Sequence, residues 1–198
     1  AYARETPPVD ARLMHYGADF HAFLGRLPVV EALPCLPGVA LLERLWREAH
    51  MAADAPALQA SHLRDVPAES LARLCPRPHP AARWRWFGEG PVLGVWQAHQ
   101  VDDEARCRAA LEAVSWRAEG ALLTRIDGKV EVRRTSRAAC ALLDACAGGA
   151  PLGVALASAL DASMEDDDVR ADPGTAAGLL RELVDAGALR GLGPEGDG

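Results

Sequence analysis

The sequence predicts an α+β protein that is mainly α-helical, with a helical domain followed by a winged-helix-like domain, a β-hairpin plus three helices. Apolar residues recur at helical spacing through the first hundred residues and again after residue 136. Two alternating runs, 121–126 and 129–134, flank Asp127-Gly128, and that dipeptide is the strongest short-range signal for a hairpin. With 49% hydrophobic and 25% charged residues, the composition is that of an ordinary globular protein.

The first domain, residues 1–100, is predicted to be helical because of this spacing. Asp10 can cap the first helix, and Pro67 suits the first position of a short one. Three prolines between residues 75 and 80 exclude a helix there. In chain order the predicted elements are helices over 10–27, 39–54 and 67–74, a strand over 83–87 and a helical stretch over 92–99.

Residues 101–114 are predicted to form a charged helix or linker, residues 115–192 the second domain, and residues 193–198 a tail. Thr135 or Ser136 caps the helix after the hairpin, and Gly148-Gly149 ends it. Asp172-Pro173 caps the third helix. In chain order the predicted elements are strands over 121–126 and 129–134, helices that begin near residues 136, 151 and 173, and a short strand over 188–192.

The cysteines indicate a reducing, cytoplasmic environment. There are five, no two of them have the C-x-x-C spacing, and the odd number argues against a disulfide framework or a zinc site.

No run of about 18 apolar residues and no secretory signal occur, so we expect no membrane association. The chain begins at Ala1 without Met, and we expect a segment to be missing before it.

A series of short motifs marks the first domain. In order they are Tyr16-Gly17-Ala18-Asp19-Phe20, Leu33-Pro34-Cys35-Leu36-Pro37, Glu43 with Trp46, His50-Met51-Ala52-Ala53-Asp54-Ala55, His79-Pro80 and Val95-Trp96-Gln97-Ala98-His99. With these the chain resembles the N-terminal domain of the HvfC/BufC family, long labelled a DNA-binding domain, although Cys35 stands where an aromatic residue is expected. The resemblance implies a non-catalytic accessory subunit that brings a ribosomally synthesised peptide to a multinuclear non-haem iron oxidase.

The second domain resembles, in pattern, the PqqD-type peptide-recognition domain, or RiPP recognition element. In that family a leader peptide adds a strand to the hairpin edge and packs against the third helix. The resemblance implies a peptide-binding site of Lys129, Val130, Glu131, Val132, Arg133, Arg134, Leu180, Leu183 and Val184. The alternative is that the apolar members are core residues and that the terminal strand or the first domain covers the edge.

Three polar residues lie along the second predicted helix. Glu43, His50 and Asp54 are spaced i, i+7 and i+11, which would be compatible with a metal or acid–base site. No second helix offers a partner motif, so we interpret them as a structural network. His50 and Asp54 would pair at i, i+4, and Glu43 would satisfy a buried backbone group. We expect no metal, no cofactor and no catalytic residue; the G-x-S-x-G, phosphate-loop and dinucleotide motifs are all absent.

Charge distinguishes the two function classes. Residues 1–137 carry 18 basic and 17 acidic side chains, a balance of +1, whereas residues 138–198 carry 3 and 11, a balance of −8. The alternative function is a DNA-binding transcriptional regulator of the winged-helix type, whose third helix would enter the major groove. That helix carries Arg181, Glu182 and Asp185 and follows an acidic run, which opposes phosphate contact. We therefore expect a peptide partner rather than DNA.

Overall fold

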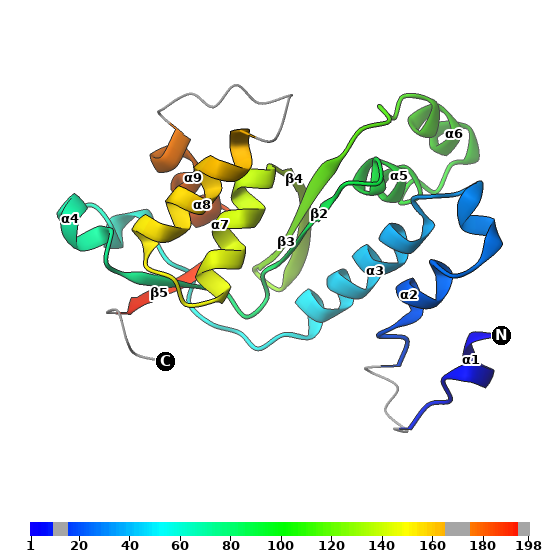
Figure 1. Cartoon of the computed structure of the whole chain (residues 1–198), viewed down its shortest axis with the longest axis horizontal. Helices are drawn as coiled ribbons and strands as arrows, with labels where there is room; N and C mark the ends of the chain where they lie inside the picture. The colour runs from blue at the N-terminus through cyan, green and yellow to red at the C-terminus, as the bar shows by residue number, and fades with distance from the viewer. Residues whose placement is uncertain (10–15, 165–174, 194–198) are drawn as a thin grey trace. The chain divides into compact units, whose positions relative to one another are not determined.

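The computed structural model describes residues 1–9, 16–164 and 175–193 and shows an α+β fold with two small antiparallel sheets (Figure 1). The chain divides into two compact units, each built from two separate segments. Residues 1–45 and 87–119 form the first unit, and residues 46–86 and 120–198 form the second. The predicted domains 1–100 and 115–192 do not coincide with these units, because residues 46–86 pack with the hairpin and the helices that follow it.

The first unit is helical, as its sequence pattern indicates. Its elements are α1 (Tyr2–Glu5), α2 (Phe20–Leu24), the 3₁₀ helix η1 (Pro28–Glu31), most of α3 (Leu36–Met51), α5 (Val92–Ala98) and α6 (Glu104–Glu112). The long helix predicted over 10–27 is wrong in its described part. Residues 16–19 form a turn in which Gly17 has a φ of 85°, so the helix begins only at Phe20. The predicted cap, Asp10, lies outside the described residues.

Close contacts between side chains hold the helices of the first unit together. A Cβ at Gly38 in α3 would lie 2.4 Å from Cγ2 of Val92 in α5, so only glycine permits this approach. The indole N–H of Trp96 donates to Oε1 of Glu43 at 2.6 Å. Near the N-terminus, the ring of Tyr2 lies 5.2 Å from that of Phe20 and 5.3 Å from that of Phe23.

The helices of the second unit surround its hydrophobic core. They are the 3₁₀ helix η2 (Ala60–His62), α4 (Ala68–Leu71), α7 (Arg137–Ala147), α8 (Leu152–Met164) and α9 (Thr175–Asp185). Ser136 caps α7 by accepting from the backbone N–H of Ala139 at 3.1 Å, which decides between the two predicted caps. The core unites α7, α8 and α9 with Leu122 of the hairpin and Leu189. The predicted cap of α9, Asp172-Pro173, lies outside the described residues.

The strands form two separate sheets. In one, β1 (Cys75–Pro78) pairs antiparallel with β5 (Leu189–Gly193). In the other, the order is β2 (Arg83–Phe87), β3 (Glu119–Ile126), β4 (Lys129–Thr135). The predicted hairpin is confirmed, and so are the strands over 83–87 and near the C-terminus. Within the described residues, no helix combines the length and apolar character that crossing a bilayer requires.

Candidate functional site

The candidate site is the outer edge of the hairpin, and its geometry begins at the turn. Asp127 has a φ of 49° and Gly128 a φ of 78°, the two positive values that a type I′ turn requires. This turn sets the register of the strands from Ile126 opposite Lys129 to Gly120 opposite Thr135. The register is continuous, so the positions of all β4 residues relative to β3 are fixed.

Strand β4 lies at the end of its sheet. The residues that flank a two-residue turn form a hydrogen-bonded pair, and pair types then alternate along an antiparallel ladder. Val130, opposite Arg125, and Val132, opposite Leu123, therefore fall in non-hydrogen-bonded pairs. Their N–H and C=O groups point away from β3. In the part of the chain that the structure describes, no strand lies on that side, so these groups can pair with another chain.

The two faces of β4 differ in character. Val130 and Val132 are half-buried and share a face with Arg134, which is exposed. Lys129, Glu131 and Arg133 lie on the other face, where Arg133 Nη2 contacts Glu131 Oε2 at 2.6 Å. One face of β4 thus carries two valines and an arginine. The other face is polar and contains the ion pair of Glu131 with Arg133.

The predicted apolar wall of the site is not available to a ligand. Leu183 is fully buried, and Leu180 and Val184 are each 7% exposed. All three belong to the core cluster with α7 and α8. The expectation that they line a groove is therefore wrong. They are core residues, which is the alternative that the sequence left open.

The predicted network of Glu43, His50 and Asp54 is also wrong. Helix α3 ends at Met51, so His50 and Asp54 cannot pair across a helical turn. The ring of His50 stacks on Trp46, with centroids 5.4 Å apart and planes at 6°. Glu43 belongs to the first unit and accepts from a side chain, Trp96, rather than from a backbone group. The three side chains therefore do not contact one another as predicted; Glu43 binds Trp96, the ring of His50 stacks on Trp46, and Asp54 pairs with Arg125.

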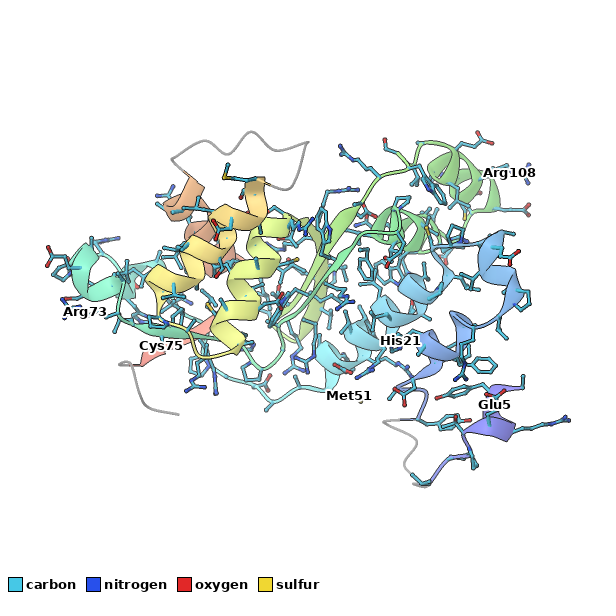
Figure 2. The ribbon with its side chains drawn as sticks, in the orientation of Figure 1. Glu5, His21, Met51, Arg73, Cys75 and Arg108 are labelled. Atoms are coloured by element: carbon cyan, nitrogen blue, oxygen red, sulfur yellow. The ribbon has the colours of Figure 1, made fainter. Side chains whose placement is uncertain are left out.

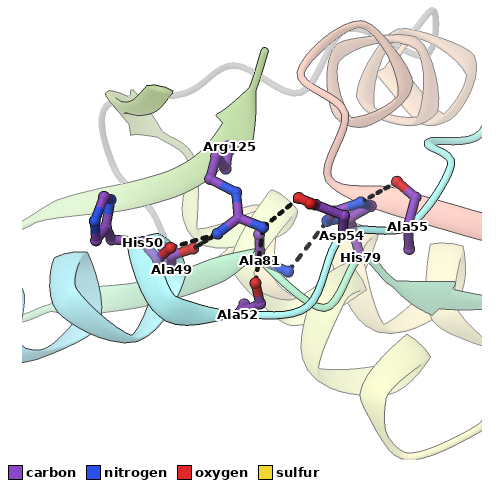
Figure 3. Close-up of polar contacts among 8 residues, drawn as sticks. All are labelled: Ala49, His50, Ala52, Asp54, Ala55, His79, Ala81 and Arg125. Carbon is purple, nitrogen blue, oxygen red and sulfur yellow. Dashed lines mark hydrogen bonds and ion pairs between the residues drawn. The ribbon is translucent and has the colours of Figure 1, made fainter. Parts of the chain in front are cut away.

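Arg125 binds the carbonyl groups at the end of α3, a role that the sequence pattern did not identify (Figure 3). Its guanidinium donates to the carbonyl oxygens of Ala49 at 3.2 Å, of Ala52 at 2.7 Å and of His50. It also contacts Oδ1 of Asp54 at 2.6 Å, while its side chain is only 10% exposed. These donors satisfy carbonyls that a helix terminus leaves without partners. One feature of the sequence does indicate such a role. Arg125 lies on the same face of the strand as Ala121 and Leu123, and a charged residue on a buried face needs polar partners.

His79 makes a second polar connection close to this clamp (Figure 3). Its Nδ1 accepts from the backbone N–H of Ala81 at 3.1 Å, so Nε2 carries the proton and donates to the carbonyl of Ala55 at 2.8 Å. The side chain is 6% exposed. His79 therefore joins the segment after α3 to the loop between β1 and β2, and this contact gives it a structural role.

The cysteines are mostly inert core residues. Cys75, labelled in Figure 2, is buried at the start of β1. Burial raises the pKa of the Cys140 and Cys146 thiols from 9.0 to about 12, and burial is also the main cause that raises the pKa of Cys35. Only Cys107 is partly exposed. Burial keeps a reagent away from a thiol, so the four buried cysteines should be unreactive in the folded protein.

This predicts the outcome of thiol titration with 5,5′-dithiobis(2-nitrobenzoate) at pH 8. We expect one thiol, Cys107, to react within minutes in the native protein, and all five to react after denaturation in guanidinium. The variant Cys107→Ser is the control and should remove the fast phase. Two or more fast thiols in that variant would contradict the assignment.

Across the described ranges, no group of three or more His, Cys, Asp and Glu side chains is placed to hold a metal ion. No model of a known protein family matches the chain, and a comparison with curated proteins also gives no match.

Proposed function

We propose that this chain is a non-catalytic, cytoplasmic partner protein that binds a ribosomally synthesised precursor peptide. It delivers this peptide to a multinuclear non-haem iron oxidase. The observation that carries the proposal is the edge position of β4, with the main-chain groups of Val130 and Val132 directed outward. The oxidase is proposed as the second partner because the first hundred residues resemble the HvfC/BufC family. The hairpin and its three helices are proposed to be a winged-helix-like recognition domain because they resemble the PqqD type.

Strand addition explains how such an edge captures an extended peptide. Val130 and Val132 together offer two donors and two acceptors, and each ladder hydrogen bond contributes about 0.5–1.5 kcal/mol net. Side chains of the added strand then pack on alternate faces, which fixes its register. Because Leu180, Leu183 and Val184 are core residues, the affinity comes from the strand and its own side chains rather than from a groove on α9.

The same geometry favours a peptide over DNA. Helix α9 would be the reading helix of a winged-helix regulator, but Glu182 and Asp185 outweigh its one arginine. Glu182 is placed against the hairpin, where it accepts from the hydroxyl of Thr135 at 3.4 Å. Phosphate groups would meet this carboxylate, so contact through α9 costs electrostatic repulsion.

The proposal is tested by replacing Val132 with proline. Proline removes the outward N–H without breaking the ladder to β3, because Val132 lies in a non-hydrogen-bonded pair. We expect the affinity for the precursor peptide to fall by up to about tenfold, because one ladder hydrogen bond is lost. The measurement is fluorescence anisotropy with labelled synthetic copies of the short peptides encoded beside the gene. Binding to the co-expressed oxidase should be largely unchanged.

Two variants separate the main chain from the side chain. Val132→Ala keeps the N–H and should bind the peptide within a few-fold of wild type. Glu131→Pro removes an N–H that points toward β3, so it should lower thermal stability instead. If Val132→Pro has wild-type affinity while folded by circular dichroism, or if no neighbouring peptide binds the wild-type chain, the proposed function is wrong.

A further inference from the structure

Helix α8 is apolar on its outer side as well as on its inner side (Figure 1). Inner residues such as Leu152 and Ala155 are buried in the core of the second unit. On the outer side, Val154 is 55% exposed, Leu160 41% and Met164 86%. The outer side of a surface helix is normally covered by polar and charged residues. Helix α8 therefore presents apolar side chains to solvent where most helices do not.

The exposed apolar residues of α8 form one stripe along the helix. Their spacing of i, i+3, i+6 and i+10 places them within a sector of about 120° around the helix axis. We call these four exposed residues the α8 stripe: Val154, Ala157, Leu160 and Met164. Apolar residues that are scattered singly over a surface are ordinary, whereas a group of them on one face marks a contact surface.

The charge beside the α8 stripe is negative. Asp161 is exposed and lies in the same sector of the helix, and α8 contains no Lys, Arg or His. The sequence around it has the same sign, since residues 138–198 carry 3 basic and 11 acidic side chains. An apolar surface beside negative charge is complementary to an apolar surface beside basic residues. The partner that fits this stripe is therefore apolar and basic.

We infer that the α8 stripe is the surface on which the oxidase docks, through an amphipathic helix of that enzyme that carries Lys or Arg beside its apolar residues. Two helices fit each other because the side chains along one pack into the grooves of the other. Recognition of an amphipathic helix commonly uses apolar anchors one turn apart, which is also the spacing of the α8 stripe. This inference rests on the proposed function and adds the surface that binds the second partner.

Charge and position favour the oxidase over other occupants. A second copy of this chain would bring two acidic regions together, which costs electrostatic repulsion. The anionic surface of a membrane would repel Asp161 in the same way. The precursor peptide is assigned to the edge of β4, and α8 is not part of that sheet. Of the two proposed partners, the oxidase is thus the one left for the α8 stripe.

The test measures binding of the full chain to the purified oxidase encoded beside the gene, by isothermal titration calorimetry at low ionic strength. The double variant Leu160→Ala, Met164→Ala should bind about tenfold more weakly, because apolar contact is lost. Asp161→Arg should bind about threefold to tenfold more weakly, because a cation then meets the basic helix.

Asp185→Arg is the matched control for the charge change. Asp185 is exposed on α9, so its replacement changes the net charge equally but leaves the α8 stripe intact, and the affinity for the oxidase should stay at the wild-type value. All of these variants alter exposed residues, so their thermal unfolding should be close to that of wild type.

The outcomes distinguish this inference from the proposed function. Wild-type affinity for the oxidase in both α8 variants would overturn the inference and leave the proposed function intact. An equal loss in Asp161→Arg and Asp185→Arg would also overturn it, because binding would then depend on net charge rather than on the α8 stripe.

Two further results would assign the α8 stripe to another occupant and so overturn the inference. One is a dimer of the chain alone, seen in light scattering, that the double variant dissociates. The other is a loss of affinity for the precursor peptide in the double variant. If the wild-type chain does not bind the oxidase at all, the proposed function itself is wrong, and the inference fails with it.

Discussion

Replacing Arg125 with methionine is expected to lower the free energy of unfolding by about 3 kcal/mol. Methionine keeps most of the apolar stem but removes every donor. The carbonyls of Ala49, His50 and Ala52 then lose the guanidinium that satisfies them. The arginine side chain is 10% exposed, so water replaces these contacts poorly. Urea denaturation followed by circular dichroism measures the change.

Arg133→Met is the matched control for this prediction. Arg133 also lies on the hairpin and also pairs with a carboxylate, but its side chain is 34% exposed and its contact with Glu131 is local. Surface ion pairs of this kind contribute about 0–1 kcal/mol. If the two variants lose equal stability, the contacts of Arg125 with the end of α3 contribute no more than a surface pair does.

Leu183→Ala is expected to destabilise the second unit by about 3 kcal/mol, within the range measured for buried leucines in protein cores. Leu183 has no exposed surface and packs in the cluster formed by α7, α8, α9 and the hairpin. The substitution leaves a cavity that rigid neighbours fill only in part. Its effect should be a lower denaturation midpoint with little change in the affinity of the folded protein for a precursor peptide.

Leu160→Ala is the matched control. Leu160 lies on α8 and is 41% exposed, so this substitution should lower the free energy of unfolding by about 0.5 kcal/mol or less. The pair also tests whether the apolar residues of α9 belong to the core. If Leu183→Ala retained wild-type stability and lost peptide binding, Leu183 would contact the ligand and the core assignment would be wrong.

Local patterns predicted the hairpin and the helices that follow it, but they placed residues 46–86 in the first domain rather than with this hairpin. The hairpin follows from Asp127-Gly128, because few dipeptides accept two positive φ angles. Helix α7 follows from its cap at Ser136 and from its apolar face. By contrast, β1 was not predicted, because Pro76 and Pro78 lack the backbone N–H groups that a strand normally donates. Its partner is β5, more than one hundred residues later, and no local signal encodes such a pairing.

The candidate site was predicted only in part for the same reason. Alternation along β4 assigns Val130 and Val132 to one face, and the sheet order confirms that the strand lies at an edge. The apolar residues of α9 have a spacing that suits both a core and a groove, so only tertiary packing decides between them. The clamp of Arg125 on α3 joins residues about seventy-five positions apart and depends on the register of the hairpin.

The pairing of β1 with β5 has a consequence for how the protein is made. During synthesis, Cys75 emerges from the ribosome long before Gly193, its partner in the ladder. The main-chain groups of β1 therefore stay without their ladder partners while more than one hundred further residues are translated. Closing so long a loop is entropically slow, and contacts of this separation raise the contact order of the second unit. The final folding step of this unit therefore follows the synthesis of β5, and until then the nascent chain exposes a strand edge while aggregation and chaperone binding compete with folding.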